Sequence, residues 1–485
     1  MHISFTSSIF YFYAAYLFSM FNKTIVFTIF VILFSGTNLS ASAQVLTLQQ
    51  AVQTALNNYG TIKAKGSYVN ASKALLKESA REALPDVNIS AQQDYGTING
   101  QNGPLYGFKG LGTASSGPAM SSPNWNAAFG GLYLANLNWD FYSFGKAKQR
   151  IKVSASQLSL DESDLAQEKF QLQVKVAAAY LSLLAAQRLT KSQQDNLNRA
   201  IALRNAVVPR VKNGLNAGVD SSLVNAGVSN AKIALLRSKD YEQEQANQLA
   251  VLLNTQEHQF LLDTLFITRV PVATQDSGLA SLQKHPLLQY YQNRIDVSNQ
   301  KAKYYHTMQY PTFSAFGIAQ ARGSGFDYNY SAANPKAFTQ NYWDGIKPAT
   351  GNYLLGVGVI WNLTSPLRVQ QQVLAQQLTS QGLKNEYSLV DEQLKNQYAL
   401  AESKMHNALA ALEEAPVQVK AAADAYLQKT VLYKNGLSNI VDVTQALYAL
   451  NLAETDKNIA ENNVWQALLL KAASAGDFGL FINEF

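Results

Sequence analysis

The sequence predicts an α+β membrane protein in which four transmembrane strands per chain help to complete an oligomeric β-barrel, and long α-helices continue the barrel into an aqueous space. Three observations lead to this prediction. The chain contains two copies of a unit of roughly 220 residues. Each copy has two segments of strand length with alternating polarity, and each copy ends in a pair of long helical segments with polar surfaces.

The internal repeat is clearest in residues 212–220 (KNGLNAGVD), which return as residues 434–442 (KNGLSNIVD), 434 − 212 = 222 residues later. Further anchors keep nearly the same spacing, 361 − 139 = 222 and 311 − 85 = 226 residues: Trp139 with Trp361, and Pro85 with Pro311. Anchors that keep their order over such a length indicate duplication of a whole structural unit. The two halves are therefore expected to share one architecture.

Residues 1–43 are predicted to be a secretory signal. Lys23 precedes an apolar run at 25–34, and a small-residue cleavage site follows at 41–43 (ASA). Met20 is a possible true start within this segment. The alternative, an N-terminal membrane anchor, is disfavoured because a membrane span needs about 20 apolar residues. We expect the mature chain to leave the cytoplasm.

Composition excludes several classes of protein. The chain has no cysteine, which excludes disulfides, thiolate metal sites and lipid attachment to a cleavage-site cysteine. Its net charge of +6 is small and scattered, so nucleic-acid binding is not predicted. The five histidines are not paired at helical spacing, and there is no phosphate-binding loop followed by a helix. We therefore predict no enzyme activity, no metal site and no cofactor.

Unit one comprises residues 44–270 and unit two residues 271–485. Apolar spacing of three and four predicts helices, and alternation of apolar and polar residues predicts strands. In unit one the predicted elements are a helix at 46–82, a strand at 85–95, a loop at 96–130, a strand at 131–141 and long helices at 143–211 and 221–262. In unit two they are a helix at 279–308, a strand at 311–320, a loop at 322–352, a strand at 353–363 and long helices at 366–434 and 441–474.

Two of the strands have clearly different faces. The predicted lumen-facing residues are polar: Asn136, Asn138 and Asp140. The predicted lipid-facing residues are apolar: Trp139, Phe141, Val357, Val359 and Trp361. The strand after Pro311 alternates poorly, and its pattern leaves its faces unassigned.

A strand of about ten residues is long enough to cross a bilayer at a tilt. Four strands cannot close a barrel, and open sheet edges in lipid have no hydrogen-bond partners, so other copies of the chain must complete the sheet. The long helices carry Gln, Lys, Asp and Asn on their exposed positions, so they extend into water, for about 100 Å at 1.5 Å per residue. A soluble coiled-coil protein and a surface adhesin or receptor remain as alternatives.

The chain resembles the TolC family of outer-membrane efflux proteins over nearly its whole mature length. The most specific match is the motif Gly-x5-Asp-Val, which runs from Gly436 to Asp442 and Val443, with Tyr433 three residues before the glycine. Gly214 to Asp220 is a partial copy. The resemblance implies a homotrimer with a twelve-stranded barrel in the outer membrane of a Gram-negative bacterium and a helical tunnel through the periplasm. It also implies a periplasmic adaptor (membrane fusion) protein as a partner and, indirectly, an inner-membrane transporter, in tripartite efflux or type I secretion.

The resemblance further implies a gate and adaptor contact at the helical tip, formed by Gly214, Asp220, Tyr433, Gly436 and Asp442. Tyr433 and Asp220 stand where the family has a closing link, and three copies of Asp442 would form a ring of carboxylates at the entrance. Two family positions differ here, because Ser438 replaces a basic residue and Gln445 an acidic one. The alternative is that Asp220 and Asp442 only cap the returning helices.

Overall fold

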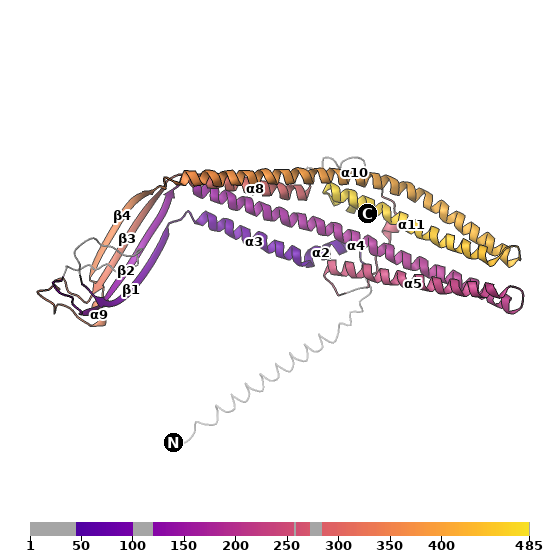
Figure 1. Ribbon diagram of the computed structural model, residues 1–485, viewed down its shortest axis with the longest axis horizontal. Coiled ribbons are helices and arrows are strands. Elements are labelled where there is room, and N and C mark those ends of the chain that lie inside the picture. Colours follow the sequence, from indigo (N-terminus) through magenta and orange to yellow (C-terminus); the bar gives the residue numbers. More distant parts are fainter. Residues whose placement is uncertain (1–44, 100–119, 257–258, 272–283, 485) are drawn as a thin grey trace, which may run out of the picture.

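The four strands and the long helices occupy opposite ends of an elongated molecule (Figure 1). The computed structural model describes residues 45–99, 120–256, 259–271 and 284–484. The predicted signal at 1–43 lies outside the described residues, as do most of the first predicted loop and the start of the helix predicted at 279–308. No helix among the described residues combines the length and the apolarity needed to span a membrane.

The strands form one antiparallel sheet in the order β1-β2-β3-β4, which confirms the predicted fold class of one protomer. The strands are β1 (Asp86–Thr97), β2 (Ala127–Tyr142), β3 (Thr312–Ser324) and β4 (Thr350–Ile360). The register aligns Trp139 with Ala315, and Ala315 with Val357. The two halves of the repeat therefore meet in the sheet where β2 pairs with β3.

Each half of the chain contributes a long helical hairpin that extends away from the sheet (Figure 1). The hairpins are α4 (Lys146–Lys212) with α5 (Gly218–Leu253), and α10 (Ser365–Lys434) with α11 (Ile440–Ala475). The remaining helices are α2 (Leu48–Asn58), α3 (Gly60–Arg81), α6 (Leu265–Thr268), α8 (Pro286–Thr307), α9 (Tyr342–Ile346) and α12 (Gly479–Ile482).

Several bounds differ from those predicted. The helix predicted at 46–82 is divided, because Tyr59 adopts an extended conformation (φ −64°, ψ 124°) between α2 and α3. The helix predicted to reach residue 262 ends at Leu253, where Asn254 adopts a left-handed conformation. The helix predicted from residue 279 begins at Pro286. The loop predicted at 322–352 contains α9 and the ends of two strands.

The main core lies in the middle of the molecule, where α2, α4, α5, α11 and α12 meet. Tyr180 on α4 is fully buried there, and its hydroxyl donates to the Leu46 carbonyl (2.8 Å) and accepts from the Asp263 amide (3.0 Å). Trp465 on α11 donates to the Phe266 carbonyl (2.8 Å). These bonds tie Leu46, Asp263 and Phe266, which lie outside the long helices, to α4 and α11, because buried polar groups require partners.

A duplicated contact joins the sheet to the helices. The Trp139 indole donates to the Ala83 carbonyl (2.9 Å), and the Trp361 indole donates to the Gln309 carbonyl (3.1 Å). Ala83 and Gln309 both lie two residues before the proline that opens a strand, at Pro85 and Pro311. The same junction therefore occurs in both units. A tryptophan near the end of the second strand of each unit binds the turn between the preceding helix and the first strand.

A buried histidine links α8 to the end of α11. The Nδ1 atom of His285 accepts from the Leu287 amide (3.1 Å), and its Nε2 atom lies 3.1 Å from the Ala473 carbonyl. These bonds require a neutral ring that carries its proton on Nε2. Burial lowers the pKa of His285, and the bond to Ala473 opposes this shift in part.

Thermal stability is expected to fall as the pH decreases below about 6.5, the ordinary pKa of an unfolded histidine. The lowered pKa of folded His285 contributes stability above that pH, and this contribution is lost as the pH falls through the folded pKa. Melting curves of wild type and His285→Asn at several pH values measure the contribution of His285 to this pH dependence. Asparagine is chosen because it keeps a capping oxygen that does not titrate. His406→Asn, at an exposed position on α10, is the control. An unchanged pH profile in His285→Asn would contradict this assignment.

Candidate functional site

The sheet separates the predicted lumen-facing and lipid-facing residues onto opposite faces. Asn138 pairs with Asp86 of β1, and Asn136 pairs with Asn88, so both belong to a polar face. Asp140 shares this face, because its carboxylate accepts from the Ser314 hydroxyl (2.6 Å). This set also includes Ser90 and Gln92 of β1. We call it the polar face of the sheet.

The opposite, apolar face carries Trp139 in register with Val357, with Ala315 between them. Val359 pairs with Phe313 on the same face, and Trp361 follows β4 at the same alternation. The register shifts after Trp139, but the Phe141 ring lies 6.0 Å from the Trp139 ring. Trp139, Val357 and Val359 thus lie on one face of the sheet, with the Phe141 ring next to Trp139 and Trp361 just beyond the end of β4.

The register also assigns the faces of β3, which its sequence pattern did not. Ala315, Gly317 and Ala319 lie on the apolar face, whereas Phe316 and Ile318 lie on the polar face. A side chain at Gly356 would meet the Phe316 ring at 2.4 Å, so this ring packs over a glycine of β4. Phe316 and Ile318 therefore fill space on the polar face, while Ala315, Gly317 and Ala319 leave the middle of the apolar face flat.

At the far end of the helices, two similar turns close the hairpins. Gly214 and Gly436 adopt left-handed conformations, with φ of 75° and 74°. The next amide donates back to the helix in both turns, from Leu215 to the Arg210 carbonyl and from Leu437 to the Leu432 carbonyl (both 2.9 Å). Each glycine thus ends its long helix in the left-handed conformation that favours glycine at this position.

The two turns also share a side-chain hydrogen bond to the aspartate that follows. Asn216 donates to Asp220 (2.9 Å), and its counterpart in the repeat, Ser438, donates to Asp442 (3.1 Å). Asp220 and Asp442 lie in the first turns of α5 and α11, after the capping positions, which are Ala217 and Asn439. The alternative in which these aspartates are the helix caps is therefore wrong.

Asn216 connects the two hairpins. Its Nδ2 atom donates to the Tyr433 hydroxyl (2.9 Å), and its Oδ1 atom accepts from Arg210 Nε (3.1 Å). Arg210 also donates to the Lys434 carbonyl (3.1 Å), and its guanidinium lies 5.7 Å from the centre of the Tyr433 ring. The predicted partners Tyr433 and Asp220 are thus joined through Asn216, which the motif comparison missed together with Arg210.

Tyr433 is the central side chain of this contact between hairpins. It is 5% exposed and packs with Ile440, Val443 and, from the other hairpin, Val207. Burial raises the pKa of Tyr433, Asp220 raises it further, and Arg210 opposes the shift. The hydroxyl is therefore neutral at physiological pH and accepts a hydrogen bond from Asn216.

Asp442 has a cationic partner that the motif comparison also missed. Lys429 on α10 lies 2.9 Å from the Asp442 carboxylate. This hydrogen bond, together with that from Ser438, lowers the pKa of Asp442. The carboxylate is therefore ionised at physiological pH, but Lys429 balances much of its charge within the same chain.

Replacing Lys429 is expected to raise the cation selectivity of the channel entrance above that of the wild type. In Lys429→Gln the Asp442 carboxylate loses its neutralising neighbour, so an entrance ring formed by it would attract cations more strongly. In Asp442→Asn the selectivity for cations should fall. Reversal potentials in planar bilayers under a salt gradient measure both shifts. Identical reversal potentials in both variants and wild type would place Asp442 away from the ion path.

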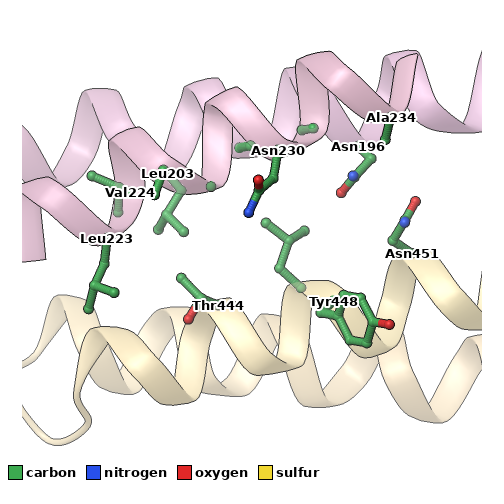
Figure 2. Close-up of a pocket in the computed structure, with 14 residues that line it drawn as sticks. Asn196, Leu203, Leu223, Val224, Asn230, Ala234, Thr444, Tyr448 and Asn451 are labelled. Carbon is green, nitrogen blue, oxygen red and sulfur yellow. The ribbon is translucent and has the colours of Figure 1, made fainter. Parts of the chain in front are cut away.

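An open groove lies between the hairpins above the tip. Figure 2 shows Asn196, Leu223 and Asn230 on one side, and Thr444, Tyr448 and Asn451 of α11 on the other. Its volume is about 400 Å³. Farther from the tip, ion pairs join α4 to α11: Arg199 binds Glu454 through two bonds (2.6 and 3.0 Å), and Arg188 binds Glu461. The hairpins therefore contact each other at the tip and above the groove.

Among the residues that the structure describes, no group of three or more His, Cys, Asp or Glu side chains is placed to hold a metal ion. The polar network at the tip lies on helix ends and links structural elements, with its groups satisfied by one another.

Solved structures of outer-membrane channels share this architecture. The Vibrio cholerae protein VceC matches with a TM-score of 0.70 at 14% identity, over 89% of this chain and 96% of that chain. The Campylobacter jejuni channel CmeC matches with a TM-score of 0.70 at 14% identity, over 88% and 85%. The open state of the Neisseria gonorrhoeae channel MtrE matches with a TM-score of 0.70 at 14% identity, over 89% of each chain. No protein-family model and no curated protein sequence matches the chain. The chain has the fold of the TolC family of outer-membrane channels.

Proposed function

We propose that this chain is one protomer of an outer-membrane channel that serves as the exit duct of a tripartite efflux or type I secretion system. The observation that carries this proposal is the sheet. Its two faces differ in polarity, and its outer strands, β1 and β4, each pair on one side only within the described chain. Such edges are not tolerated in lipid unless other copies complete them. Three copies would supply twelve strands, enough to enclose a lumen.

The exposed apolar face argues against a soluble coiled-coil protein. Leu355 and Val357 are 76% and 73% exposed, and Ile89 on β1 is 86% exposed. A soluble protein rarely leaves such a continuous apolar surface uncovered, whereas lipid covers it in a barrel. No specific feature of the described residues favours an adhesin or receptor.

In the proposed channel the helical hairpins form a tunnel that extends into the periplasm, and substrates pass through it passively. The tip, with Gly214, Asp220, Tyr433, Gly436 and Asp442, would form the gate and the contact with a periplasmic adaptor protein. An inner-membrane transporter would supply the substrate through that adaptor.

Purified protein in detergent is expected to crosslink as a homo-oligomer, with the trimer as the largest species, and to form conducting channels in planar bilayers. The open sheet edges are the physical reason, since a lone protomer cannot satisfy its backbone groups in lipid. Size-exclusion chromatography with light scattering gives the mass independently of the crosslinker. A folded monomer that forms no channels would contradict the proposal.

A further inference from the structure

Helix α9 (Tyr342–Ile346) packs against the apolar face of the sheet, at the end of the strands away from the long helices (Figure 1). The Tyr133 hydroxyl donates to the Ile346 carbonyl (3.1 Å), and the Tyr342 ring lies 5.2 Å from the Phe129 ring. Tyr133 and Phe129 lie on the apolar face of β2, the face that also carries Trp139. The helix therefore sits on the same side as the residues proposed to face lipid.

Glycines allow α9 to approach the strands closely. A side chain at Gly323 would lie 2.6 Å from the Lys347 carbonyl oxygen, and one at Gly131 would lie 3.0 Å from the Ile346 carbonyl oxygen. In the helix itself, a side chain at Gly345 would lie 2.6 Å from Phe129. Glycines on both surfaces thus let the backbones of α9 and the strands approach each other, which indicates a fixed position for α9 on the sheet.

The outer side of α9 is aromatic. Gly345 and Ile346 are buried against the sheet, whereas Trp343 is 73% exposed and its ring lies 5.1 Å from the Tyr342 ring. The Tyr342 hydroxyl donates to Gln93 of β1 (2.7 Å), so the helix is held across three strands. Asp344 and Lys347 are both exposed and their charges offset each other, so the surface of α9 is amphipathic without a net charge.

This aromatic surface lies one bilayer thickness away from the tryptophans at the other end of the strands. Phe129, beneath α9, and Trp139 are ten residues apart on β2, which is about 33 Å along a strand at 3.3 Å per residue. At a tilt of about 40° this gives a height of about 25 Å, the height of the apolar band of outer-membrane barrels. Tyr353 on β4, 83% exposed on the apolar face, lies at the same end of the sheet as α9.

We propose that α9 is a membrane anchor that seats in the outer-leaflet interface, with Trp343 at the level of the lipid headgroups and lipid as its partner. The proposal rests on the proposed barrel function. Aromatic side chains with one polar atom favour this boundary, because the ring is apolar and the N–H or O–H remains hydrated. Lipid is favoured over a neighbouring protomer because α9 packs mainly on the two central strands, β2 and β3, and reaches the edge strand β1 through the bond from Tyr342 to Gln93.

Depth-dependent quenching of tryptophan fluorescence tests this inference. The full-length protein is reconstituted in phosphatidylcholine vesicles brominated at carbons 6,7 or 11,12 of the acyl chain. The difference between wild type and W343F isolates the emission of Trp343, and phenylalanine at this exposed position leaves the fold unchanged. W125F is the matched control, because Trp125 is 82% exposed at the same end of the molecule but lies in the loop before β2. W361F reports on the opposite rim of the apolar face.

Trp343 is expected to be quenched about twofold more by the 6,7-bromolipid than by the 11,12-bromolipid, as for a residue at the interface, and Trp125 is expected to be unquenched. Because α9 carries no net charge, raising the salt concentration should leave the quenching unchanged. Quenching of Trp361 without quenching of Trp343 would overturn the anchor while supporting the barrel. If neither is quenched, the proposed function itself fails, and the anchor fails with it.

Discussion

Replacing Val357 with lysine is expected to destabilise the folded channel by about 2–4 kcal/mol. Val357 is 73% exposed in a single chain and lies on the apolar face, four residues from both Tyr353 and Trp361, which mark the two rims of that face. In the proposed barrel this position is near the middle of the bilayer, where a charged side chain has no favourable partner. Urea titration of protein folded into vesicles measures the loss, and the yield of heat-resistant oligomer gives an independent measure.

The matched control places the same lysine on the polar face. Asn138 lies on β2 opposite Asp86 of β1, so lysine there meets a carboxylate and, in the proposed barrel, water. Asn138→Lys should leave stability nearly unchanged and shift the channel conductance. Equal losses in Asn138→Lys and Val357→Lys would show that the two faces experience the same environment, which a barrel wall does not allow.

The sequence pattern predicted the faces of β2 and β4 because each alternates regularly on its own. The faces of β3 depend on the neighbouring strand. Phe316 lies on the polar face because Gly356 leaves room for its ring, and these residues are 40 positions apart. Helix α9 could not be predicted from the sequence for a related reason. Its five residues are too few for apolar side chains to recur at helical spacing. Its position is defined by contacts with Gly131 and Gly323, which no local pattern contains.

At the tip, the repeat identified the turns, but the side chains that join them differ between the copies. Gly214 and Gly436 were identified by the motif that recurs in the two units, and both occupy the left-handed position after a long helix that favours glycine. The connecting residue, Asn216, corresponds to Ser438, which is too short to reach the other hairpin. Comparison of the copies therefore conceals the role of Asn216, and its contact with Tyr433, 217 residues away, becomes visible only in three dimensions.

Replacing Asn216 with serine is expected to raise the resting conductance of the proposed channel by about 2- to 13-fold, because it removes the bond from Asn216 to Tyr433 between the hairpins, worth about 0.5–1.5 kcal/mol. Serine retains the bond to Asp220, as Ser438 retains its bond to Asp442. It also loses the bond from Arg210, which lies within the same hairpin and holds Asn216 in place. Single-channel recording in planar bilayers gives the open probability directly.

Asn435→Ala is the control, because the Asn435 side chain lies at the same tip but bonds only within α10, to the Val431 carbonyl. Tyr433→Phe and Asp220→Asn should raise the conductance in the same direction as Asn216→Ser. The double variant Asn216→Ser with Tyr433→Phe should add little to either single change, because both remove the same bond between the hairpins. Independent, additive effects would show that Tyr433 and Asn216 act through separate contacts. An unchanged open probability in all of these variants would mean that the network supports the fold of the tip without holding the entrance closed.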